Sequence, residues 1–128
     1  MAAQGRKNVH GKAGVRFKTG WTAQKNKAML RNVVTDLIMH EEVKVTSGVT
    51  KDLKRLADRM VTLAIRGDLH ARRLAAQTVR GSEALKKLFD EIGPRMAASK
   101  HKGGYTRSFK LGPRRGDSAE VTLVRWVD

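Results

Sequence analysis

Positive charge in this chain is concentrated in two runs that contain no acidic residue, and this limits which parts can pack into a core. Positions 1–35 hold eight Lys or Arg and no Asp or Glu, and positions 95–115 hold seven and none. Positions 36–94 are nearly balanced, with eleven basic and nine acidic residues. Because like charges repel one another in a compact chain, the two runs predict contact surfaces for an anion and the balanced centre predicts an ordinary folded body.

The composition narrows the class of protein. A net charge of +15 on 128 residues suits one domain whose normal partner is anionic. The chain has no cysteine, which excludes disulfides, thiolate metal ligands and cysteine nucleophiles. Its start lacks the apolar stretch of a signal peptide, and the apolar run at 60–65 is far shorter than the roughly 20 residues of a membrane span. We therefore expect a cytoplasmic protein without a membrane partner.

The two ends of the first basic run differ in character. Positions 1–20 mix Gly, Lys, Arg and Asn without any apolar period, which predicts an extended basic arm that becomes ordered on an anionic partner. Periodic apolar residues begin after position 21, so we expect 21–128 to form a single domain.

The first two helices are predicted from apolar residues that recur every three or four positions. Residues 22–40 form the first, with Thr22 as its N-cap. A second helix begins near Ser47 or Thr50, either of which is a candidate cap, and Gly67 ends it.

Two further helices follow within the balanced centre. Asp68 is the predicted cap of a helix that runs to about residue 79. Ser82 is the predicted cap of the next, which we expect Gly93-Pro94 to end, because proline disfavours helical backbone in the residue before it.

Three short segments alternate as strands do, at 42–46, 105–111 and 121–127, with turn residues at 112–117. The expected order is helix, strand, three helices and two strands. The economical arrangement is an α+β fold, a two-layer α/β sandwich in which helices cover one face of a small three-stranded sheet.

The aromatic residues divide between core and contact roles. Phe89, Phe109 and Trp126 lie on apolar faces and are predicted core residues. Tyr105 shares a strand face with Phe109, which favours packing over base stacking. For Trp21, contact with RNA and contact with the folded body remain equal alternatives.

No pattern in the chain predicts catalysis. The four histidines are scattered, and His40-Glu41-Glu42 lacks the three or four convergent ligands of a zinc site. Gly103-Gly104 leads into a strand rather than a helix, unlike a phosphate-binding loop. We therefore expect no enzyme activity, no catalytic residue, no metal site, no cofactor and no small-molecule substrate.

Five blocks resemble, in order, the family of ribosomal protein seventeen of the bacterial large subunit. They are KAMLRN at 27–32, GDLHARR at 67–73, KLFDEIGPR at 87–95, GGYTR at 103–107 and GPRRGD at 112–117. The resemblance covers about residues 25–128. It implies a structural constituent of the large (50S) ribosomal subunit that supports translation and subunit assembly. It also implies contact with 23S rRNA and with neighbouring large-subunit proteins near the exit of the peptide tunnel.

The candidate phosphate contacts are basic residues of the two runs and of the third helix. They are Arg6, Lys7, Lys12, Arg16, Lys18, Lys25, Lys27, Arg31, Arg72, Arg73, Arg107, Lys110, Arg114 and Arg115. Arg can grip a phosphate with two parallel hydrogen bonds, whereas Lys acts as a point charge. We expect recognition of RNA shape rather than of base sequence. The rival classes are a DNA-binding protein, a small enzyme and a membrane-active cationic protein.

Overall fold

A computed structural model describes residues 23–99 and 103–127 of the chain. The predicted cap Thr22 and the alternatives for Trp21 lie outside these residues. The elements, in chain order, are α2 (Ala23–His40), β1 (Glu42–Thr46), α3 (Ser47–Arg66), α4 (Leu69–Ala76), α5 (Ser82–Lys87), the π-helical turn η2 (Leu88–Ile92), α6 (Gly93–Ala98), β2 (Thr106–Pro113) and β3 (Glu120–Trp126). This order confirms the predicted α+β fold.

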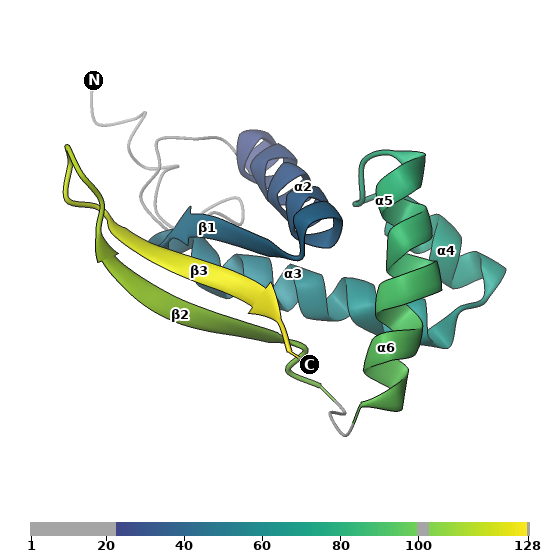
Figure 1. Ribbon diagram of the computed structural model, residues 1–128. Coiled ribbons are helices and arrows are strands. Elements are labelled where there is room, and N and C mark those ends of the chain that lie inside the picture. Colours follow the sequence, from purple (N-terminus) through teal and green to yellow (C-terminus); the bar gives the residue numbers. More distant parts are fainter. Residues whose placement is uncertain (1–22, 100–102, 128) are drawn as a thin grey trace.

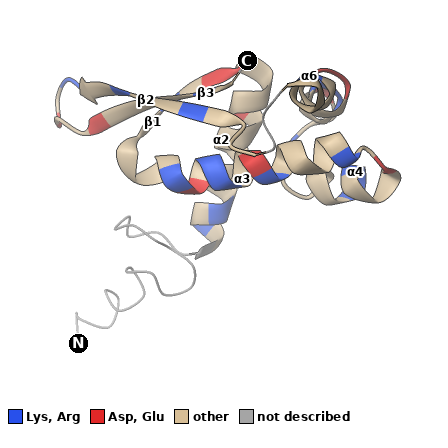
Figure 2. Ribbon diagram, turned by 90° about the horizontal axis from the view of Figure 1, so that it is seen from below, with Lys and Arg blue, Asp and Glu red and all other residues tan. Residues whose placement is uncertain are grey.

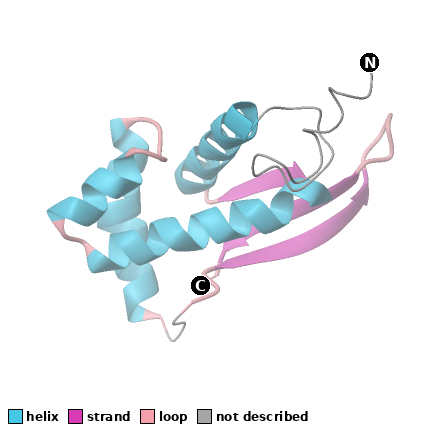
Figure 3. Ribbon diagram, turned by 180° about the vertical axis from the view of Figure 1, so that it is seen from behind, coloured by secondary structure: helices cyan, strands magenta, loops and turns pink. Residues whose placement is uncertain are grey.

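The strands form one antiparallel sheet in the order β1-β3-β2. Figures 1 and 3 show the long helix α3 lying along one face of this sheet. Thr122, Val124 and Trp126 of β3 alternate with more exposed neighbours and are buried on the helix side. The helices therefore cover one face, as in a two-layer sandwich.

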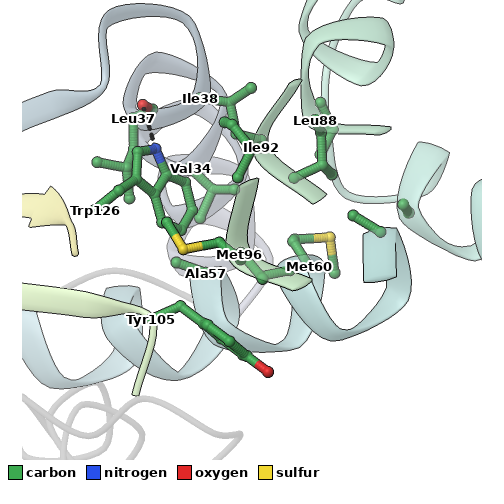
Figure 4. Close-up of a cluster of buried hydrophobic side chains, with 14 of the residues drawn as sticks. Val34, Leu37, Ile38, Ala57, Met60, Leu88, Ile92, Met96, Tyr105 and Trp126 are labelled. Atoms are coloured by element: carbon green, nitrogen blue, oxygen red, sulfur yellow. Dashed lines mark hydrogen bonds between the residues drawn. The ribbon is translucent and has the colours of Figure 1, made fainter. Parts of the chain in front are cut away.

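The core lies where α2, α3, the η2 segment and β3 meet (Figure 4). Leu37 and Ile38 of α2, Met60 of α3 and Ile92 of η2 are fully or almost fully buried. The indole of Trp126, which is 4% exposed, reaches this cluster from the sheet and confirms the predicted core position.

Local chemistry explains the junction between α3 and α4. Gly67 ends α3 in the left-handed conformation, with φ of 71°, and its N–H donates to the carbonyl of Leu63 at 3.0 Å. The carboxylate of Asp68 accepts a hydrogen bond from the N–H of Ala71 at 2.7 Å. Both predictions are confirmed, although α4 ends at Ala76 rather than near 79.

The predicted cap of α3 is wrong. Thr46 occupies the cap position without a side-chain hydrogen bond, because β1 runs directly into the helix. The Ser47 hydroxyl instead lies 3.0 Å from the Thr122 hydroxyl in β3, and the Thr50 hydroxyl donates back to the carbonyl of Thr46 at 3.5 Å. These two groups tie the helix to the sheet rather than capping it.

The predicted cap of α5 is also wrong, by one position. Gly81 precedes the helix with φ of 92°, and Ser82 is already its first residue, without a side-chain cap bond.

The fourth helix does not end at Gly93-Pro94. The N–H of Gly93 donates to the carbonyl of Leu88, five residues back, which is the hydrogen bond of a π-turn. Pro94 then lies in the first turn of α6, a position at which proline is common. A Cβ at position 93 would lie 3.0 Å from both the Cβ and the carbonyl oxygen of Ala64, so the glycine permits close packing of α6 on α3.

The predicted positions of the other aromatic residues are confirmed in two cases and wrong in one. Phe89 and Tyr105 are buried, which confirms packing for both, but Phe109 is 45% exposed, so its predicted core position is wrong. Phe109 pairs with Leu123, on the face of the sheet opposite to Val124. Tyr105 lies just before β2, where the alternation of the strand does not apply.

Candidate nucleic-acid interface

A groove of about 890 Å³ lies between α2 and α3. Its lining comes from Asn26, Lys27, Leu30 and Arg31 of α2, from Asp52, Arg55, Leu56 and Arg59 of α3, and from Gln77 and Thr78 after α4. Four cationic side chains and one carboxylate line the groove, so its field favours an anionic ligand.

The cations of α3 form a stripe along the helix. Lys51, Arg55 and Arg59 are four residues apart, so they share one face of the helix, and all three are exposed. In Figure 2 the Lys and Arg positions appear along α3 and at the neighbouring end of α2. Sequence reasoning missed Arg55 and Arg59 because they fall in the charge-balanced centre, although their four-residue spacing was a readable signal.

The side chain of Arg31 is held in place by a hydrogen bond. Its Nε donates to the carbonyl of Thr78 at 3.2 Å, which joins α2 to the turn after α4. Next to it, the Thr35 hydroxyl donates to the carbonyl of Arg31 at 2.8 Å and accepts from the N–H of Arg80 at 3.0 Å. These bonds fix one end of the groove and hold the guanidinium beside it.

Asp58 of α3 has a structural task. Its Oδ1 accepts from the N–H of Tyr105 at 3.1 Å and lies 3.4 Å from the hydroxyl of Thr106. Burial raises the pKa of Asp58, while these hydrogen bonds and the charge of Lys54 act in the opposite direction. The carboxylate therefore holds the start of β2 against α3.

The two predicted arginines of α4 have different surroundings. The guanidinium of Arg72 lies 5.0 Å from the centre of the Phe89 ring and 3.7 Å from the carboxylate of Asp90. Arg73 is exposed and has no ion pair with any residue of the described ranges. Arg72 thus helps to hold α4 against the η2 segment, whereas Arg73 is available to an external anion.

The hairpin between β2 and β3 uses one of its predicted arginines internally. Arg114 donates from Nε and Nη2 to the carboxylate of Asp117 at 2.8 and 2.7 Å. This pairing, helped by the N–H of Ala119, holds the pKa of the Asp117 carboxyl far below its usual range. The neighbouring Arg115 is exposed, with no ion pair to the described residues.

The face of the sheet turned away from the helices also carries charge. Arg107 lies directly opposite Arg125 in the register of β2 and β3, and both are exposed. Like charges in such a cross-strand pair repel each other, although Glu42 of β1 lies opposite Arg125 on its other side and offsets part of this charge. Lys110 lies on the other face, opposite Thr122, and is partly neutralised by Glu120, 3.8 Å away.

The predicted residues therefore do not gather in one place. Lys27 and Arg31 share the groove with Arg55 and Arg59, and Lys25 lies on the same helix, α2. The hairpin turn and α4 are at opposite ends of the molecule (Figure 1). The other candidates lie outside the described residues; they are Arg6, Lys7, Lys12, Arg16 and Lys18.

The described ranges hold neither a metal cluster nor a membrane span. No group of three or more His, Asp or Glu side chains there is placed to hold a metal ion. Among the helices described, none combines the length and apolarity needed to cross a bilayer.

Comparison with known proteins gives one consistent family. Residues 29–127 match the family model described as Ribosomal protein L17. A Large ribosomal subunit protein bL17 from Shouchella clausii (strain KSM-K16) is 46% identical over 118 residues, which cover 86% of this chain and 97% of that protein. One of the same name from Clostridium perfringens (strain SM101 / Type A) is 48% identical over 115 residues, covering 90% of this chain and 99% of that protein.

Proposed function

Because this chain belongs to the family of ribosomal protein L17, we propose that it is a constituent of the large ribosomal subunit that binds 23S rRNA near the exit of the peptide tunnel. The family is one of structural proteins rather than enzymes, and its members work on the ribosome in the cytoplasm. The chain thus supports translation and subunit assembly by holding rRNA, with neighbouring large-subunit proteins as further partners.

The observation that carries rRNA binding is the cationic groove between α2 and α3. Lys27, Arg31, Arg55 and Arg59 line one concave surface with a single carboxylate, Asp52, among them. Most protein contacts to nucleic acid go to phosphate oxygens, for which Lys and Arg are the usual donors. The groove is the feature of the described residues best suited to follow an RNA backbone.

The other predicted contacts lie apart from this groove. Arg73 on α4, and Arg107 and Arg115 on the hairpin, are exposed and lack ion pairs with the described residues. Contacts at separated places suit a folded RNA, which a protein recognises by shape. The proposal also includes a basic arm, residues 1–20, that precedes the domain at 21–128. The arm would contact rRNA phosphates with Arg6, Lys7, Lys12, Arg16 and Lys18.

Filter binding of the full chain to 23S rRNA fragments and to duplex DNA at equal salt tests the proposal. If about ten phosphates are neutralised, log K should fall against log salt with a slope of roughly −7 to −9. Equal affinity for duplex DNA, or a flat salt response, would argue against rRNA as the partner. Position near the tunnel exit is tested by cross-linking the subunit-bound chain to a stalled nascent peptide.

A charge-matched pair of variants tests the groove itself. Arg55→Ala with Arg59→Ala should lower rRNA affinity and make the salt slope shallower by about 1 to 2, because two phosphate contacts are lost. Lys44→Ala with Lys86→Ala removes two exposed positive charges outside the groove lining. Equal losses from both pairs would mean that total charge, not the groove, binds the RNA.

A further inference from the structure

A buried amide lines the groove between α2 and α3 without a hydrogen-bond partner for its oxygen. Asn26, in the first turn of α2, is only 4% exposed. Its Oδ1 has no hydrogen-bond partner among the described residues, and no other buried side-chain oxygen or nitrogen within those ranges shares this condition. Buried polar atoms are nearly always paired, so an unpaired acceptor on a residue of the groove lining points to a ligand that donates a hydrogen bond.

The surroundings of Asn26 define the shape of such a ligand. Leu30 and Leu56, one from each helix, are half-buried and offer apolar surface beside the amide. The cationic side chains of Lys27, Arg31, Arg55 and Arg59 belong to the same lining. A volume of about 890 Å³ lies within the roughly 300–1,000 Å³ of sites that hold small organic ligands. A flat group with a donor, attached to an anion, fits this set of neighbours.

We propose that the groove binds one unstacked nucleotide of RNA, with adenine against Leu30 and Leu56 and its amino group donating to Oδ1 of Asn26. The phosphates on either side of that nucleotide lie against the cations of the groove. This inference rests on the proposed function, and it adds recognition of a base to recognition of shape. Asn and Gln are the side chains that usually pair with adenine, and RNA-binding proteins read bases mainly where these are unstacked.

The test uses the full chain and two RNA probes that differ by one functional group. One is a twelve-residue oligoadenylate, and the other has purine riboside, which lacks only the amino group, in place of each adenosine. Fluorescence anisotropy at fixed low salt should show about tenfold tighter binding of the oligoadenylate, as expected for one well-placed hydrogen bond to a buried acceptor. Equal affinities for the two probes would overturn the inference without any variant.

Variants then assign the preference to Asn26. Asn26→Leu keeps the size of the side chain and removes the acceptor, so the tenfold preference should disappear; Asn26→Ala repeats the test with a smaller side chain. Asn32→Leu makes the same change at an exposed position of α2 and should keep the preference. A preference that survives both Asn26 changes, or that is lost equally in Asn32→Leu, overturns the inference.

The same measurements separate this inference from the proposed function. A chain that binds 23S rRNA but neither oligonucleotide has no nucleotide site in the groove, which overturns the inference alone. A chain that does not bind 23S rRNA contradicts the proposed function itself.

Discussion

The indole Nε1 of Trp126 donates a hydrogen bond of 3.2 Å to the carbonyl oxygen of Leu37, 89 positions earlier in the chain (Figure 4). The same oxygen accepts the N–H of Glu41 at 2.8 Å, at the turn where α2 ends and β1 begins. Glu41 has a positive φ of 67°, a conformation that is uncommon for residues other than glycine. One carbonyl thus connects the last strand of the sheet to the turn that leads into the first.

Trp126→Phe should lower the free energy of unfolding by about 1 to 3 kcal/mol. The change removes the hydrogen bond to Leu37 and leaves a small cavity where the indole was packed. Urea unfolding followed by circular dichroism measures the difference. An unchanged midpoint would show that the turn after α2 does not depend on this contact.

Phe89→Ala and Phe109→Ala should differ sharply in their effect on stability. Phe89 is 8% exposed, so its truncation should cost about 3 to 5 kcal/mol. Phe109 is 45% exposed on the open face of the sheet, so the same change there should cost about 1 kcal/mol or less. Thermal melts of the two variants side by side test this. Similar melting temperatures would contradict the placement of Phe109 on the uncovered face.

Asp58→Asn should be at least as stable as the parent at pH 7. Burial raises the pKa of Asp58 when the chain folds, so the folded protein holds this proton up to a higher pH than the unfolded chain does. The contribution of Asp58 to stability is therefore full below about pH 3.9, the usual pKa of an aspartate. It falls as the pH rises from there through the raised pKa of the folded state. Asparagine keeps an acceptor for the N–H of Tyr105 and removes this pH-dependent loss.

The measurement for Asp58 is urea unfolding between pH 3 and pH 7. The stability of Asp58→Asn relative to the parent should increase across this range. Asp58→Ala is the control: it leaves the N–H of Tyr105 without its acceptor and should lose about 1 to 2 kcal/mol. A difference between Asn variant and parent that does not change with pH would argue against a raised pKa.

Arg115→Ala and Arg114→Ala should separate RNA binding from hairpin structure. Arg115 is exposed without an ion pair to the described residues, so its loss should weaken rRNA binding and leave the melting temperature unchanged. Arg114 is paired with Asp117, so its loss should also loosen the turn. Hydrogen exchange at the N–H of Ala119, which Asp117 holds at 3.0 Å, should become faster only in Arg114→Ala. Equal exchange in both variants would contradict the structural role of Arg114.

The fold was predictable at the junction of α3 and α4, where local chemistry decides the backbone, but not at the starts of α3 and α5. Gly67 and Asp68 act within one turn of their own positions, and the structure confirms both. Phe109 could not be placed, because alternation in a strand shows which residues share a face but not which face the helices cover. Gly93-Pro94 was misjudged for a similar reason: the close approach of Ala64, 3.0 Å from a Cβ at position 93, is a tertiary contact.

The candidate site was predictable only in part. The basic runs without acidic residues predicted Lys27 and Arg31 as contacts. Arg55 and Arg59 have acidic neighbours in the sequence, so the local net charge did not indicate a contact there. The groove exists because α2 and α3 lie side by side, and single residues do not encode that arrangement. The unpaired oxygen of Asn26 likewise becomes visible only when its burial is known.

The order of the strands affects when this protein can fold during its own synthesis. The central strand of the sheet, β3, comes last of the three in sequence, and β1 and β2 are each hydrogen-bonded to β3. Synthesis runs from the N-terminus, so α2, α3 and the helices that follow can pack before residues 120–126 exist. Until those residues emerge, β1 and β2 lack their partner and expose edges that invite pairing with other chains. The sheet can therefore form only after β3 has been synthesised, and premature termination before β3 would leave a helical body with no sheet.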